Sequence, residues 1–253
     1  MSSTNAGGGR RRPGASVLHV RLSPRERRVV ELVGAFGQLT SGQIGELAFD
    51  GLASQTPLKR TLKRLYEREL LSRLEMRLVG GSGGASAQYV YQLGREGWRE
   101  LQRPGRYMAR EAVDYHTRDV ADCYIRLVRG HRTGVFTLAE FVTEPVCWRH
   151  VGNIHLMPDA YARLEWPSQG NWAGWWLEVE RSRKNNQRIR EKVRRYWQAF
   201  QRWQEPVFPL VVFVAPDESR AQEVNAIVHQ APPEAGGLFK TTTLASFPES
   251  HNR

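Results

Sequence analysis

The chain has 253 residues, 40% of them hydrophobic, and its 37 Lys and Arg against 26 Asp and Glu give a formal net charge of +11. This length and apolar content are enough for one large domain or two ordinary ones, and we expect two, each with its own core. The positive charge favours a polyanionic partner, above all nucleic acid. Before Tyr107 there are 18 basic and 9 acidic residues, against 19 and 17 from there on, so the surplus is mostly N-terminal.

Several protein classes are excluded by what the sequence lacks. Its two cysteines, Cys123 and Cys147, have no disulfide pattern and no Cys/His spacing typical of zinc. No segment approaches the roughly 18 apolar residues of a membrane span, and the first residues lack the apolar core of a signal peptide. We therefore expect a cytoplasmic protein without a membrane partner. Residues 1–15, with three consecutive arginines, are expected to be a disordered basic tail, either simply solvated or contacting DNA as an arm.

Residues 22–71 predict three helices in quick succession. Ser-Pro at Ser23 and Thr-Pro at Thr56 have the pattern of helix N-termini, and Thr40 or Ser41 caps a short helix between them. The third helix buries one apolar side and exposes four cations: Lys59, Arg60, Lys63 and Arg64. Their spacing forms two adjacent i, i+4 rows, and this face is the one that would read a major groove.

Two strand-like segments, residues 71–79 and 87–93, follow the third helix and are separated by the flexible loop GGSGGAS. Arg77 on the first of them is a further candidate DNA contact. A helix over residues 95–102 closes the unit. Three helices and a hairpin predict a winged helix-turn-helix domain over residues 16–107. The alternative keeps this fold but assigns the charge to an ordinary solvated face or a protein interface.

Residues 108–253 predict an α/β domain with a different order of elements. The expected order is αβββαβα, with segments at residues 109–128, 135–142, 155–164, 173–180, 184–203, 206–215 and 217–231. The fold class predicted for the whole chain is therefore α+β.

That order, together with Pro158 and Asp159 and then Glu178, Val179 and Glu180, resembles the PD-(D/E)xK nuclease fold. The resemblance implies that Asp159 and Glu178 are the metal ligands and that the catalytic set includes Glu180. Such carboxylates hold a divalent ion, here Mg²⁺, that orients water and stabilises charge on the scissile phosphate. Alternation along a strand puts Glu178 and Glu180 on one face.

One position departs from the nuclease motif, because Glu180 stands where the family has lysine. Lys184 is the nearest cation that could replace it in an active site. Without such a group we expect ion binding more than cleavage, and no cofactor is required. The alternative is structural: the two glutamates pair with Arg181 or Arg188, and Asp159 only follows a proline in a turn.

The helix expected over residues 184–203 is strongly basic. Between Arg181 and Arg202 there are nine basic residues and one acidic residue. We expect a buried stripe at Ile189, Val193, Trp197 and Phe200. The opposite stripe contains the candidate phosphate contacts Arg188, Lys192 and Arg195. An ordinary solvated face is the alternative.

The whole layout resembles the replication-relaxation family. The resemblance covers YERELLSRLEMRLV, YVYQLGREGWREL, and PDA before LEVERSRKNNQRIREKVRRY. It implies a double-stranded-DNA-binding accessory protein of a plasmid or phage, acting in replication, relaxation or mobilisation beside replication or conjugation proteins. Two alternatives stay open: a divalent-metal-dependent nickase or endonuclease, and a transcriptional regulator whose C-terminal half forms a homodimer.

Overall fold

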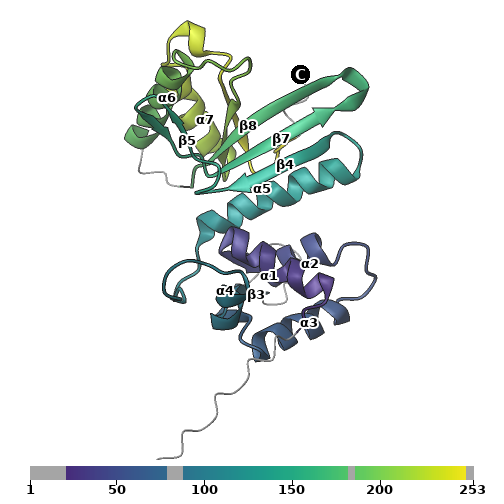
Figure 1. Ribbon diagram of the computed structural model, residues 1–253. Coiled ribbons are helices and arrows are strands. Elements are labelled where there is room, and N and C mark those ends of the chain that lie inside the picture. Colours follow the sequence, from purple (N-terminus) through teal and green to yellow (C-terminus); the bar gives the residue numbers. More distant parts are fainter. Residues whose placement is uncertain (1–20, 79–87, 182–185, 249–253) are drawn as a thin grey trace, which may run out of the picture.

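The computed structural model describes residues 21–78, 88–181 and 186–248 (Figure 1). The basic tail, the glycine-rich loop and Lys184 lie outside these residues, as does the side chain of Arg77. The described chain is a mixture of helices and sheets, so the α+β class is confirmed. Among the described residues, none of the helices combines the length and the apolar character needed to cross a bilayer.

The N-terminal part contains the predicted helices and hairpin. Its elements are α1 (Pro24–Phe36), β1 (Gln38–Thr40), α2 (Ser41–Ala48), α3 (Thr56–Glu67), β2 (Leu71–Leu78), β3 (Gln88–Leu93) and α4 (Arg95–Glu100). The three strands form an antiparallel sheet in the order β1-β3-β2. The short strand β1 was not predicted, and it attaches the segment between α1 and α2 to the hairpin.

Local hydrogen bonds explain where these helices begin. Ser23 caps α1 and exchanges hydrogen bonds with Glu26, and Thr40 caps α2 in the same way with Gln43. Each pair is a capping box, which satisfies two backbone donors at the helix start. Thr40 rather than Ser41 is thus the cap of α2. No side chain caps α3, although Pro57 fixes the backbone in its first turn.

The C-terminal part is built around a five-stranded sheet. Its helices and strands are α5 (Tyr115–Arg132), β4 (Thr137–Thr143), β5 (Arg149–Val151), β6 (Ile154–Leu156), β7 (Ala160–Trp166), β8 (Asn171–Val179), α6 (Asn186–Phe200), β9 (Leu210–Ala215), α7 (Glu218–Val228) and β10 (Phe239–Thr243). Short 3-10 turns occur at Pro167–Gln169 and Pro233–Ala235. The sheet order is β10-β9-β8-β7-β4, and β5 and β6 form a separate hairpin. Neighbours β4, β7 and β8 are antiparallel, whereas β8, β9 and β10 are parallel.

Two predicted boundaries in this part were wrong. The strand expected over residues 155–164 is divided into β6 and β7, because Pro158 has no N–H to donate to a ladder. The helix expected from residue 109 begins only at Tyr115, after the cap at Asp114. The preceding segment is held by two glutamine side chains instead: Gln38 bonds the backbone of Ala112 and Asp114, and Gln92 bonds both backbone groups of Arg110.

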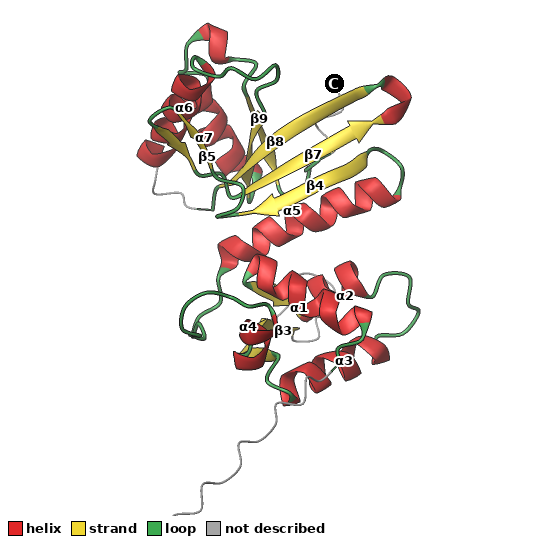
Figure 2. Cartoon of the chain, viewed as in Figure 1, coloured by secondary structure: helices red, strands yellow, loops and turns green. Residues whose placement is uncertain are grey.

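The cores follow the two faces of the sheet. On one face Trp175, Leu177 and Val179 of β8 join a buried cluster that continues through α5 into α1, α2 and α3. On the other face Trp176 packs with residues of α6 and α7. Figure 2 shows α5 lying between the sheet and the N-terminal helices, with α6 and α7 across the sheet. The expected two separate cores are therefore not observed, since one core is shared through α5.

Glu26 connects α1 to α3. It is 4% exposed, and its carboxylate accepts hydrogen bonds from the Ser23 N–H at 2.8 Å and from Arg64 Nε at 2.7 Å. Burial alone would raise the pKa of Glu26, but these hydrogen bonds and the charge of Arg64 outweigh it, so the pKa is lowered. Glu26 therefore stabilises the folded state fully only when its carboxylate is ionised.

We expect Glu26→Gln to lower the free energy of unfolding at pH 7 by about 1 kcal/mol, because Arg64 loses its ionic partner but is half exposed. A lowered pKa means that this stabilisation is present above the unfolded-state pKa and is lost as pH falls through the folded-state value. Urea titrations at pH 7 and pH 3 measure the difference between variant and wild type. It should be smaller at pH 3, and the exposed control Glu31→Gln should show none at either pH; an equal loss at both pH values would contradict the assignment.

Candidate functional site

The four cations predicted to read DNA all lie on α3. Lys59, Arg60 and Lys63 are exposed, while Leu58, Leu62 and Leu65 on the same helix are buried. Arg64 is also exposed but is tied to Glu26 as described above. Lys63 lies 3.7 Å from Glu67, one turn along the helix, which is a weak surface pair. The face carried by Lys59, Arg60 and Lys63 is therefore the accessible part of the predicted DNA-reading surface.

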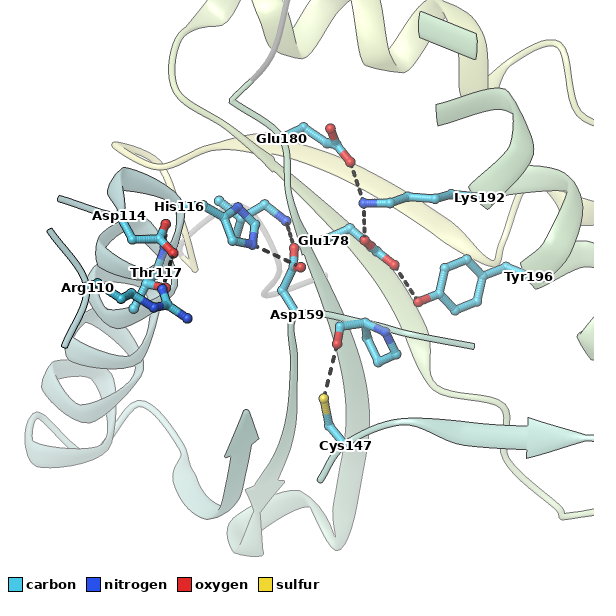
Figure 3. Close-up of polar contacts among 12 residues, drawn as sticks. Arg110, Asp114, His116, Thr117, Cys147, Asp159, Glu178, Glu180, Lys192 and Tyr196 are labelled. Atoms are coloured by element: carbon cyan, nitrogen blue, oxygen red, sulfur yellow. Dashed lines mark hydrogen bonds and ion pairs between the residues drawn. The ribbon is translucent and has the colours of Figure 1, made fainter. Parts of the chain in front are cut away.

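The predicted carboxylates converge at one end of β7 and β8. Asp159 directly precedes β7, and its N–H donates to the Leu177 carbonyl at 3.0 Å. Its Oδ2 accepts from the Val179 N–H at 2.7 Å, so both its backbone and its side chain are fixed against β8. Glu178 and Glu180 follow on the opposite face of β8 from Val179 and are 1% and 6% exposed. The three carboxylates are thus buried neighbours (Figure 3).

Lys192 of α6 is the cation of this cluster. Its Nζ lies 2.5 Å from Glu178 Oε2 and 2.5 Å from Glu180 Oε1, and its side chain is only 14% exposed. The expected place of Lys192 on an exposed stripe was wrong. The buried stripe of α6 is Ile189, Val193, Tyr196 and Ala199 rather than one ending in Trp197 and Phe200. This small rotation turns Lys192 towards β8.

Burial and charge oppose each other at Glu178. Burial raises the pKa of Glu178 to about 7, Lys192 counteracts this rise, and Asp159 adds to it. Tyr196 donates its hydroxyl to Glu178 Oε1 at 2.6 Å, and burial together with Glu178 raises the pKa of that tyrosine. Burial alone would lower the pKa of Lys192, but the three carboxylates outweigh it and raise the pKa, so the ammonium stays charged.

His116, at the start of α5, completes the cluster on the side away from Lys192. Its Nε2 lies 3.0 Å from Asp159 Oδ1. This hydrogen bond raises the pKa of His116 although burial opposes the rise. Sequence reasoning missed His116, because no spacing in the chain relates the start of α5 to the residue before β7. Only the packing of α5 against the sheet brings the two together.

The remaining predicted residues are arranged differently. Arg181 pairs with Asp119 of α5 and not with the glutamates. On α6, Arg188 is exposed and Arg195 is half-buried. Arg190 and Arg194 are also exposed, although the sequence did not single them out. Helix α3, which carries the cations, and strands β7 and β8, next to which the carboxylates lie, are on opposite sides of α5, so the structure does not combine them into one site (Figure 1).

We expect Lys192→Met to lower the free energy of unfolding at pH 8 by about 3 kcal/mol, because two buried glutamates lose their cation. The loss should be smaller at pH 5.5. Without Lys192 the pKa of Glu178 rises further above its unfolded value, so the destabilisation grows as pH increases through that range. Thermal unfolding at both pH values measures this, with the exposed Arg194→Met as control. A loss that is the same at pH 5.5 and pH 8 would show that the charge of the glutamates is not its cause.

Comparisons with known proteins identify the family. A crystal structure of a MarR family transcriptional regulator from Silicibacter pomeroyi DSS is 23% identical over 31% of this chain and 47% of that chain, with a TM-score of 0.24. The match thus spans about half of that regulator, and its TM-score is too low to support a structural conclusion. No curated protein matches the chain. Residues 30–211, more than half of the chain, match the replication-relaxation family. The chain therefore belongs to the replication-relaxation family.

Proposed function

We propose that the protein binds double-stranded DNA and acts as an accessory protein in the replication or relaxation of a mobile element, a plasmid or phage. Membership of the replication-relaxation family supports the process. The observation that carries the binding role is the exposed cationic face of α3, formed by Lys59, Arg60 and Lys63 on a helix whose other side is buried. Such a helix can enter a major groove while its apolar side keeps it fixed to the protein.

The surroundings of α3 support this role. The order α1, β1, α2, α3, β2, β3 with the sheet order β1-β3-β2 agrees with the winged helix expected from the sequence, in which α3 would be the reading helix. A groove of about 950 Å³ runs between α2, α3 and the hairpin. Its lining includes Lys59, Lys63 and Arg73. Arg73 stacks between the rings of Tyr66 and Tyr89, at 4.9 and 4.2 Å from the ring centres.

Acidic residues of the same groove are neutralised from α5. Glu46 pairs with Arg129 at 2.9 Å, and Asp50 pairs with Arg132 at 3.1 Å. The cations on α3 are therefore not cancelled by the acids of the groove. The surface next to α3 remains suited to a phosphate backbone.

We expect Arg60→Ala to weaken binding to a specific duplex by about 1–3 kcal/mol while leaving thermal stability unchanged, because the exposed Arg60 would contact base edges. Arg64→Ala should lower both DNA affinity and thermal stability, since it also removes the ionic partner of Glu26. Gel-shift titrations on specific and random duplexes measure the binding, and Lys240→Ala on β10 is the control. Unchanged affinity of Arg60→Ala for both duplexes would remove α3 from the DNA interface.

A second candidate function is metal-dependent cleavage of a DNA strand, and the position of Lys192 favours it. The C-terminal part resembles a PD-(D/E)xK nuclease in which Asp159 and Glu178 stand at the metal-ligand positions. Their carboxylate oxygens are the hard ligands that Mg²⁺ prefers, so the donor set fits this ion. When bound, the ion would polarise the scissile phosphate and the attacking water.

The chain's own contribution in this second candidate is the ammonium of Lys192. The sequence has Glu180 at the lysine position of the motif, but Lys192 reaches the same carboxylates from α6 (Figure 3). It can hold a positive charge beside the developing charge on a phosphate, which is the role the missing lysine would have. Lys192 therefore replaces Lys184 as the candidate catalytic cation.

For this second candidate we expect supercoiled plasmid incubated with Mg²⁺ or Mn²⁺ to be nicked by the wild-type protein and not by Asp159→Ala or Lys192→Met. EDTA should prevent nicking, because the carboxylates then lack their ion. Agarose gels resolve supercoiled from nicked plasmid. Plasmid that stays supercoiled at protein concentrations where gel shifts show binding would exclude the cleavage function and leave the binding function intact.

A further inference from the structure

Three potential metal ligands meet next to the carboxylate cluster. His116 begins α5, Glu144 follows β4, and Asp159 precedes β7, so three separate segments contribute. One ligand atom from each lies within 4.8 Å of the other two. The Glu144 N–H donates to the Asp159 carbonyl at 3.1 Å, which fixes these two residues to each other. The arrangement is therefore held by the sheet and by the start of α5.

The cations near these three residues form ion pairs mainly with other carboxylates. Lys192 pairs with Glu178 and Glu180, Arg110 pairs with Asp114, and Arg181 pairs with Asp119. His116 is the cationic group that directly contacts Asp159. Loss of hydration and then the charge of Asp159 raise the pKa of Glu144. A bound cation would relieve this repulsion between the two carboxylates.

The three ligands differ chemically from an all-oxygen magnesium site. An imidazole nitrogen is a better ligand for divalent transition metals than for Mg²⁺, which prefers oxygen, and a mixed set of one imidazole and two carboxylates can hold Mn²⁺. The hydrogen bond between His116 Nε2 and Asp159 Oδ1, 3.0 Å long, places the two atoms so that an ion could take the place of the shared proton. Binding would release that proton, as metal binding to histidine generally does.

We propose that His116, Glu144 and Asp159 form a site for a divalent transition-metal ion and that His116 makes the site select Mn²⁺ over Mg²⁺. The site shares Asp159 with the second candidate function, and to that extent the proposal rests on that function. Ion binding does not require cleavage or DNA, however. Binding measured without DNA therefore tests the site separately from the proposed functions.

The test uses the full chain, stripped of metal and titrated with Mn²⁺ or Mg²⁺ in the absence of DNA. Electron paramagnetic resonance of free Mn²⁺ gives the stoichiometry, and thermal unfolding follows both ions. We expect one Mn²⁺ per chain at the site, and stabilisation by Mn²⁺ at concentrations on the order of tenfold lower than by Mg²⁺. His116→Asn should weaken Mn²⁺ binding on the order of tenfold or more, with little effect on Mg²⁺.

Two further variants make the outcome decisive. Glu144→Gln, whose side chain is exposed, should also weaken Mn²⁺ binding, and it serves if His116→Asn unfolds without metal. His229→Asn, at the far end of α7, is the matched control and should bind Mn²⁺ as the wild type does. Equal affinity for Mn²⁺ and Mg²⁺ in the wild type would overturn the proposal. So would Mn²⁺ binding that survives in both His116→Asn and Glu144→Gln but is lost in Glu178→Gln, since the ion would then lie between Asp159 and Glu178.

Discussion

The ammonium of Lys192 between two buried glutamates is the interaction on which the C-terminal part depends. β8 is the middle strand of its sheet, and its alternation sends apolar side chains to one face and Glu178 to the other. Buried carboxylates are costly unless a cation accompanies them. Lys192 supplies that cation, because the rotation of α6 about its axis turns this side chain towards β8. The structural requirement and the candidate chemistry therefore share Lys192 and Glu178.

The helix α5 connects this cluster to the rest of the chain. It packs on β4 and β8 on one side and on α1 and α2 on the other, and it carries His116 and Asp119 to the end of the sheet. Its arginines neutralise acids of α2 and the turn that follows, next to the proposed DNA-reading helix. The two halves of the described chain therefore share a continuous core through the packed side chains of α5.

Much of the fold could be predicted because its signals are local. Caps such as Ser23 and Thr40, and the apolar spacing of α1 and α3, depend on neighbours within one or two turns. The start of α5 could not be predicted, since it depends on Gln38 and Gln92, which hold the preceding backbone from distant strands. The break at Pro158 was visible in the sequence, but the apolar residues around it concealed the short hairpin of β5 and β6.

The sequence by itself determined the α+β class, the family resemblance, the cationic face of α3 and the presence of Asp159, Glu178 and Glu180 near one another. These follow from periodicity and from the order of strands, which are properties of short segments. Only the tertiary structure decided which cation joins the carboxylates and that His116 and Glu144 lie beside them. The physical reason is that helical periodicity leaves the rotation of α6 open by about one residue, and packing of Tyr196 and Ala199 against the sheet fixes it.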